Sequence, residues 1–190
     1  MNTYDGNGVP HDASSGQFVT RRLGEADPAQ VLGGIGPSGA SWRRLPDGSI
    51  EHTELDGTTW KQLTNGGIEY RDADGEYHRD AGWAVIWPDG SRFRFQHGVL
   101  HSDGDQPTVE RADGTVEYMQ DGLHHRVGGP AMIIPSTGQE IWYQHGLLHC
   151  DEGPAIRGSD GEATSADAYF YKGVFCPDRA AFDQMRAAEL

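Results

Sequence analysis

Residues 121–131 read Asp-Gly-Leu-His-His-Arg-Val-Gly-Gly-Pro-Ala, and they contain the pattern Gly-x-x-His followed by a Gly-Pro-Ala step. The Gly-x-x-His pattern also occurs at residues 75–78, 98–101 and 146–149, and a fifth copy at 173–176 ends in Cys176. The leading glycines are 23, 24, 24 and 27 residues apart. Such regular spacing predicts a repeat of about 24 residues.

Each repeat has the pattern of two strands and two tight turns. In one copy, apolar residues 84–87 precede Asp89-Gly90, and aromatic and basic residues alternate over 91–95. Asp-Gly between two such runs favours a β-hairpin with a type I′ turn. Alternation of period two indicates a strand with one solvent-exposed face. The sequence therefore predicts an antiparallel array of β-hairpins.

Other positions recur with the same period. A step of small residues follows each histidine, and its copies are 82–84, 106–108, 129–131 and 153–155. Two apolar columns predict the core: Phe95, Met119, Tyr143 and Phe170, together with Val85, Val109, Met132 and Ile156. The last unit is four residues longer between its turn and its glycine, which predicts an insertion within 162–167.

The flanking segments differ from the repeats in pattern. Residues 1–40 are rich in Gly, Ser, Asp and Pro, which predicts a flexible or extended arm, docked through Phe18, Val19, Leu23 and Val31. Turn dipeptides recur every nine residues within 41–74 and predict a short-strand meander. Residues 75–176 form four hairpin repeats, and the Ala-rich 177–190 predicts a capping helix. The predicted fold is thus an all-β hairpin array with a short C-terminal helix.

Charge and composition limit the classes of function. The chain has 15 Lys and Arg against 29 Asp and Glu, a net charge of −14, so direct binding to nucleic acid or to an anionic membrane is not expected. The two cysteines form no CxxC pair, and no apolar run approaches the ~18 residues of a membrane span. The first residues lack the pattern of a signal peptide, which predicts a cytoplasmic location.

The stretch 121–131 is similar to a repeat of phage and bacterial proteins with the general form Asn-Gly-Lys-Leu-His-Arg-x-x-Gly-Pro-Ala, which is related to variant MORN repeats. The similarity covers about residues 74–177. It implies β-hairpin units, a role in interaction or assembly, and by analogy a phage protein that acts on a host factor. The chain departs from the pattern at Trp83, at residues 106–108 and at Cys176.

The repeated histidines are the main candidates for special chemistry: His78, His101, His125 and His149, with Cys176 in the fifth position. Units two strands wide would separate them by about 9–10 Å, too far to share one zinc ion. A tighter coil would bring them to roughly 5 Å and allow a metal column. We expect a structural role, in which each imidazole bonds a backbone carbonyl and fixes its turn, and we predict no metal and no cofactor.

Catalytic chemistry is not predicted. Cys150 directly follows His149, but neighbours in a strand point to opposite faces. Cys176 could meet His149 from the next repeat, yet no signature turn accompanies the pair. Asp103 and Asp105 lack the spaced ligands of a calcium loop, and the glycines of 33–36 lack the Lys-Ser/Thr of a phosphate loop.

Aromatic and basic residues on the repeats are the candidate binding residues, since the five tryptophans cannot all be buried in a thin sheet. They are Trp83, Trp87, Arg92, Arg94, Arg126 and Trp142. The favoured function is a non-enzymatic module that binds a host or self protein partner, with homo-oligomerisation open. One alternative is sequestration of a nucleotide-type ligand by Arg79, Arg92, Arg94, Arg111 and Arg126. Another is an acidic mimic of DNA.

Overall fold

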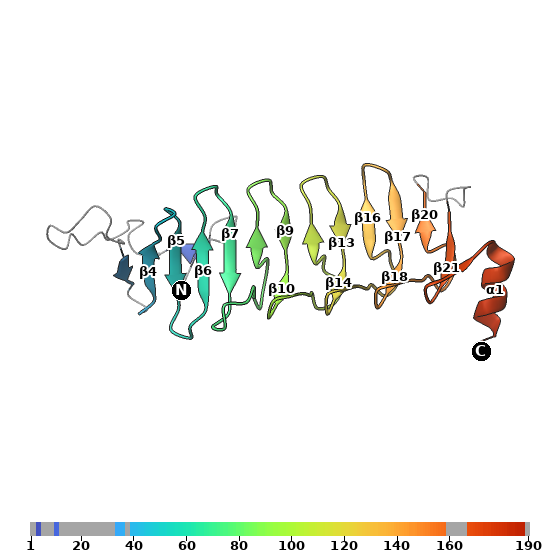
Figure 1. Cartoon of the computed structure of the whole chain (residues 1–190), viewed down its shortest axis with the longest axis horizontal. Helices are drawn as coiled ribbons and strands as arrows, with labels where there is room; N and C mark the ends of the chain where they lie inside the picture. Colours follow the sequence, from blue (N-terminus) through green and yellow to red (C-terminus); the bar gives the residue numbers. More distant parts are fainter. Residues whose placement is uncertain (1–2, 5–9, 12–32, 37–38, 159–166, 189–190) are drawn as a thin grey trace.

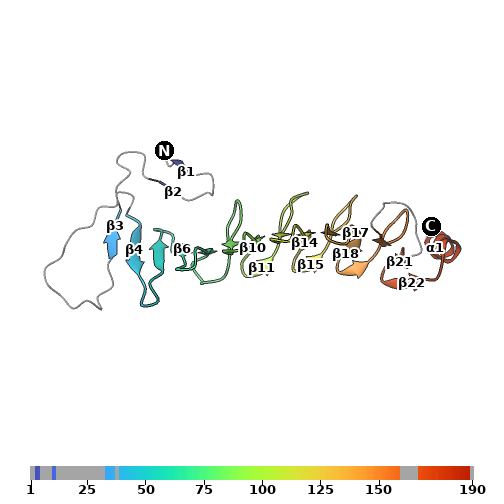
Figure 2. The same ribbon diagram turned by 90° about the horizontal axis from the view of Figure 1, so that it is seen from above.

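The computed structural model describes residues 3–4, 10–11, 33–36, 39–158 and 167–188. It is an elongated array in which one antiparallel sheet of twelve strands runs along the molecule and a helix lies at the C-terminal end (Figure 1). Small two-stranded hairpins are arranged along one side of this main sheet (Figure 2). The predicted all-β hairpin array with a short C-terminal helix is confirmed.

The strands of the main sheet lie in chain order, and neighbours are joined either by a tight turn or, between repeats, by a segment that leaves the sheet and returns to it. The first five are β3 (Gly33–Ile35), β4 (Ser41–Arg44), β5 (Ile50–Thr53), β6 (Thr59–Gln62) and β7 (Ile68–Arg71). Each repeat then adds two: β8 (Val85–Ile86) and β9 (Arg92–Phe93), β12 (Val109–Glu110) and β13 (Val116–Glu117), β16 (Met132–Ile134) and β17 (Gln139–Ile141), with β20 (Ile156–Arg157) last. A separate pair joins β1 (Thr3–Tyr4) to β2 (Pro10–His11).

The small hairpins form where the chain leaves the main sheet. They are β10 (Phe95–Gln96) with β11 (Val99–Leu100), β14 (Met119–Gln120) with β15 (Leu123–His124), β18 (Tyr143–Gln144) with β19 (Leu147–Leu148), and β21 (Tyr169–Tyr171) with β22 (Val174–Cys176). One residue before each of the first three, the chain bends. At Tyr118, for example, the N–H donates to Ala131 in the main sheet and the carbonyl accepts from the N–H of His125. We call Tyr70, Arg94, Tyr118 and Trp142, which share this pattern, the corner residues.

The type of the Asp-Gly turns differs from the prediction. At Asp89-Gly90 only the glycine has positive φ, and Gly90 N–H donates to the carbonyl of Trp87, as in a type I turn followed by a glycine bulge. Type I′ geometry occurs instead at the tips of the small hairpins, where two successive residues have positive φ. These pairs are His97-Gly98, Asp121-Gly122, His145-Gly146 and Lys172-Gly173. Gly75 has the glycine-bulge geometry, so the first Gly-x-x-His copy lies on a meander turn.

The core is thin and centres on the corners. Ala84, Thr108, Ala131 and Ala155, the last residues of the small-residue steps, are each 0% exposed, which explains the need for small side chains there. Val85, Phe93, Val109 and Met119 form a buried cluster against which Phe95 packs. Of the predicted core columns, Val85, Val109 and Met119 are buried, and the other five are partly buried. Phe93 is a core residue outside the predicted columns.

The ends of the array differ from the prediction in detail. Strand β3 belongs to the main sheet, although residues 33–35 fell within the predicted arm. Helix α1 (Arg179–Ala187) begins after Asp178, whose carboxylate accepts from the N–H of Ala181. Phe18, Val19, Leu23 and Val31 and most of the predicted insertion at 162–167 lie outside the described residues. In the described part of the chain, no helix is long and apolar enough to cross a membrane.

Candidate interaction surface

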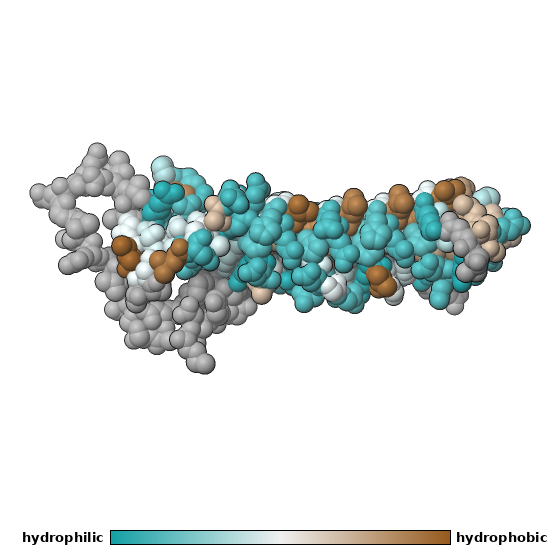
Figure 3. All heavy atoms as spheres, turned by 90° about the horizontal axis from the view of Figure 1, so that it is seen from below, coloured by the Kyte–Doolittle hydropathy of each residue, from teal (hydrophilic) through white to brown (hydrophobic). Residues whose placement is uncertain are grey.

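The small hairpins present a row of exposed apolar side chains. Each of these residues directly follows the turn glycine of its hairpin: Val99, Leu123, Leu147 and Val174, which we call the apolar row. They are 44%, 49%, 50% and 52% exposed. Burial in the core therefore does not explain why these four positions are apolar. Figure 3 shows apolar residues recurring at regular intervals along the array, with polar residues beside them.

Successive hairpins of the row are in contact. The N–H of Gly122 donates to Leu100, that of Gly146 to His124, and that of Gly173 to Leu148, each at 2.9 Å. A Cβ on Gly146 would stand 3.2 Å from a methyl carbon of Leu123, and one on Gly173 would stand 3.3 Å from Leu147. Gly146 and Gly173 therefore let the preceding leucine pack against the next hairpin, and Gly122 lies similarly against Val99.

The repeat histidines join one unit to the next. Nδ1 of His78, His101 and His125 accepts, at 3.2 Å in each case, from the backbone N–H of the residue that precedes the next turn glycine. His149 accepts from Lys172 in the same way at 3.1 Å. The partner is thus a backbone N–H of the following unit, whereas a carbonyl was expected. The fifth position, Cys176, is 1% exposed and lies beside Met185 and Phe182 under α1.

The other ring nitrogen of most repeat histidines bonds a carboxylate. Nε2 lies 3.0 Å from Asp80 in His78, 3.3 Å from Asp103 in His101 and 3.0 Å from Asp151 in His149. This pattern corresponds to the tautomer with hydrogen on Nε2, which leaves Nδ1 free to accept. In the His125 unit, Val127 occupies the position of the aspartate.

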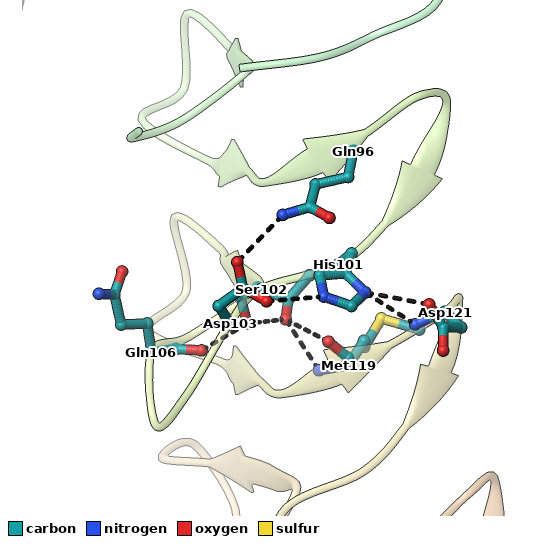
Figure 4. A network of polar contacts seen from close by, with 8 residues as sticks. Gln96, His101, Ser102, Asp103, Gln106, Met119 and Asp121 are labelled. Carbon is teal, nitrogen blue, oxygen red and sulfur yellow. Dashed lines mark hydrogen bonds and ion pairs between the residues drawn. The ribbon is translucent and has the colours of Figure 1, made fainter. Parts of the chain in front are cut away.

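The second unit replaces Ala by Thr108 and compensates for the extra hydroxyl. Figure 4 shows the surrounding polar network, which joins the loop after β11, with Ser102 and Gln106, to Met119 on β14. Ser102 Oγ lies 2.8 Å from Thr108 Oγ1 and donates to the carbonyl of Gln106 at 2.7 Å. Thr108 Oγ1 also accepts from the N–H of Met119. The departure at 106–108 from the Gly-Pro-Ala pattern therefore leaves this buried hydroxyl fully bonded.

We expect acid to weaken the junction at His125. Burial lowers the pKa of His125 from its usual 6.5, with a further contribution from neighbouring His145. Because the pKa of His125 is lower in the folded protein, the unfolded chain binds a proton first as the pH falls. The free energy of unfolding therefore decreases as the pH drops below about 6.5. The melting temperature should therefore decrease from about pH 7.5 to 5.5, and His125→Asn, which can accept the same bond without titrating, should reduce the slope. An unchanged slope would contradict this role. Some slope should remain, because burial also lowers the pKa of His52.

Arginines stack on aromatic rings beside the corners. Arg79 lies 3.9 Å from the ring centroid of Tyr70, and Arg126 lies 3.8 Å from that of Tyr118. In the second unit the corner residue is itself an arginine, Arg94, and Trp83 supplies the ring at 4.2 Å. Trp83 stands where the repeat pattern has proline, and its ring allows an arginine–aromatic stack to form in this unit as well. Burial lowers the pKa of Arg94, an effect consistent with its half-buried position between the ring and the carbonyl of Pro107.

The predicted binding residues fall into three groups. Trp83 lies under both Arg92 and Arg94 in one cation–π cluster. Arg126 and Trp142 line a shared groove of about 450 Å³ on the following units. Trp87 is 50% exposed near the far ends of the main-sheet hairpins, where it packs on Phe93 and lines a separate shallow groove.

The arginines considered for a nucleotide pocket all have partners within the protein. Arg92 bonds Glu110, Arg111 bonds Glu117, and Arg126 bonds both oxygens of Asp105. Arg79 and Arg94 donate to carbonyls of Trp83 and Pro107 while they stack on rings. An anion bound by these guanidinium groups would have to replace such contacts.

Carboxylates lie close to the apolar row. Asp121 is two residues from Leu123, and its exposed carboxylate lies 3.2 Å from Nδ1 of His101. The carboxylate of Glu76 reaches Gly98, next to Val99, since a Cβ on that glycine would stand 2.6 Å from Glu76 Oε2. Asp80, Asp103 and Asp151 project from the following loops with side chains 97%, 86% and 68% exposed. The surface is therefore apolar along one line, with carboxylates near it and with His97, His145 and Lys172 among the hairpin-tip residues.

None of the predicted binding residues belongs to the apolar row. Its signal was present in the sequence: Val, Leu, Leu and Val follow the turn glycines of four copies of Gly-x-x-His or Gly-x-x-Cys. Because the prediction placed type I′ turns at Asp-Gly, the small hairpins and their exposed sides were not foreseen.

Comparison of the chain with protein-family models gives no match, and a search of curated proteins finds no similar chain.

Proposed function

We propose that the protein is a non-enzymatic binding module that holds a basic, partly apolar segment of another protein along the apolar row. The observation that carries the proposal is the row itself, four exposed aliphatic side chains on four successive hairpins. Contiguous exposed apolar surface rimmed by polar groups is typical of protein interaction sites. The resemblance of residues 74–177 to MORN-type repeats agrees with an interaction role.

The charge of the chain favours a basic partner. The net charge is −14, and the carboxylates of Glu76 and Asp121 lie next to the row. Complementary charge accelerates association and disfavours acidic partners, while the apolar contacts supply the affinity. Binding of this kind weakens with salt because the flanking carboxylates are exposed.

The repeat length favours a regular, linear partner. Each unit contributes two strands to the main sheet, so successive row residues are separated by about 9.5 Å. A polyproline II segment returns to the same face every three residues, or about 9.3 Å. An α-helix returns after seven residues, or about 10.5 Å. The polyproline II spacing fits three consecutive intervals best, so we expect apolar residues at every third position of the partner.

Peptide display against the immobilised protein tests the proposal. We expect enrichment of peptides that carry Lys or Arg and apolar residues at every third position. Their affinity should fall at least tenfold for the double variant Leu123→Asp/Leu147→Asp. In the complex, two apolar side chains that the peptide covers would be replaced by carboxylates that lose their water. The matched control is Val127→Asp, which changes an apolar side chain 80% exposed that lies off the row.

Two results would overturn the proposal. One is the absence of any enriched basic peptide. The other is enrichment of peptides that bind the double variant and the wild-type protein equally well. Circular dichroism of the double variant establishes that its fold is intact, since both leucines are half-exposed.

A further inference from the structure

Two histidines and an aspartate meet where the meander joins the repeats. Asp72 lies at the turn after β7, His78 follows shortly, and His97 is at the tip of the first small hairpin. One ligand atom of each residue lies within 4.8 Å of the other two. Among the described residues, these three are the one set of at least three His, Cys, Asp or Glu side chains whose ligand atoms lie this close together. It was missed in the sequence because His97 is outside the Gly-x-x-His column.

We propose that Asp72, His78 and His97 bind a divalent transition-metal ion of the zinc class. Two imidazole nitrogens and a carboxylate oxygen are donors that Zn²⁺, Co²⁺ and Ni²⁺ accept, whereas Ca²⁺ and Mg²⁺ prefer oxygen donors. Three protein ligands leave at least one position for water.

The carboxylate of the site is already held in place. Oδ1 of Asp72 accepts from the N–H groups of Asp74 and Glu76 at 3.1 and 2.9 Å. Oδ2 points at Nδ1 of His97, 2.8 Å away. Two ligand atoms bound at about 2.0–2.2 Å to one ion are separated by roughly 3 Å, so this pair needs little movement to share a metal.

The imidazole of His78 has the outer contact that metal-binding histidines use. Its Nε2 bonds the carboxylate of Asp80 at 3.0 Å, which orients the ring and fixes its tautomer. The ring stacks on His97 with centroids 4.2 Å apart. A metal bound through Nδ1 replaces the hydrogen bond from the N–H of His97, so the ion connects the same two units. The side chain of His97 is 73% exposed, so one face of its ring is open to solvent while the other stacks on His78.

A second histidine pair provides an internal control. His125 and His145 stack with centroids 4.2 Å apart, and the N–H of His145 donates to Nδ1 of His125 at 3.2 Å. Val127 stands where the first pair has Asp80, and the second pair is not part of a three-residue group of metal donors among the described residues. The two sites therefore differ in carboxylates and share their histidine geometry.

Titration of the chelator-treated full-length protein with ZnCl₂ in a calorimeter tests the site. We expect saturable binding to wild type and to His145→Asn, and affinity at least tenfold weaker in His97→Asn and Asp72→Asn. Asparagine suits positions 97 and 145 because both have positive φ, 45° and 48°. Asp80→Asn should weaken binding about tenfold through the outer contact alone. Zn²⁺ should raise the melting temperature of wild type and His145→Asn and leave that of His97→Asn unchanged.

The site is ruled out if folded wild-type protein shows no saturable binding of Zn²⁺, Co²⁺ or Ni²⁺. It is also ruled out if His97→Asn binds as tightly as His145→Asn. Neither result bears on the apolar row, whose peptide binding is measured without metal.

Discussion

Replacing Phe182 by alanine is expected to release the C-terminal helix and to lower the free energy of unfolding by about 3–5 kcal/mol. Phe182 is 0% exposed and packs with Tyr171 and Cys176, the buried end of the last small hairpin. Helix α1 has only nine residues, so it depends on this contact rather than on its own propensity. Its loss exposes the apolar end of the array, which a repeat protein must cover.

Urea unfolding of Phe182→Ala, followed by circular dichroism, measures this effect. The matched control is Gln184→Ala on the exposed side of the same helix, for which we expect a change within about 0.5 kcal/mol. If Phe182→Ala and Gln184→Ala unfolded at the same urea concentration, the helix would not be a stabilising cap.

Enlarging a side chain at the end of a small-residue step is the second large effect. Ala131 is 0% exposed, its N–H donates to Ile141 and its carbonyl accepts from the N–H of Tyr118. A leucine at this position has no space unless the main sheet and the β14–β15 hairpin move apart. We expect Ala131→Leu to cost about 1–3 kcal/mol or more, because overpacking forces strained rotamers or backbone shifts.

The same substitution at Ala112, which is exposed on a turn of the main sheet, is the control for the change in side-chain type. Thermal unfolding of the two variants compares them directly. A melting temperature of Ala131→Leu equal to that of Ala112→Leu would mean that the corner is not closely packed.

The repeat period, the antiparallel sheet and the terminal helix could be predicted because each depends on local patterns. The turn types could not be predicted from Asp-Gly alone. In this copy the better signal was the residue before it: Pro88 precedes Asp89-Gly90, and proline favours the first central position of a type I turn, which moves Asp89 to the second central position and Gly90 to the bulge. Asp89 then accepts from the N–H of Ser91, an arrangement typical of aspartate in turns.

The candidate surface was predicted less well than the fold. Large aromatic and basic residues such as Trp83 and Arg94 attracted the prediction, but they pack on each other within the array. Small repeated aliphatic residues such as Leu123 and Leu147 were not singled out. Only the hairpin geometry shows that they are half-exposed, since the face to which a strand residue points depends on register and turn type.

Hydrogen exchange of the protein with and without a display-selected basic peptide tests whether the apolar row is the binding surface. We expect slower exchange at the small hairpins, residues 95–100, 119–124 and 143–148, and unchanged exchange at the glycine-bulge turns around Gly90, Gly114 and Gly138. Protection confined to those turns, or to the groove lined by Arg126 and Trp142, would contradict the assignment of the apolar row as the binding surface.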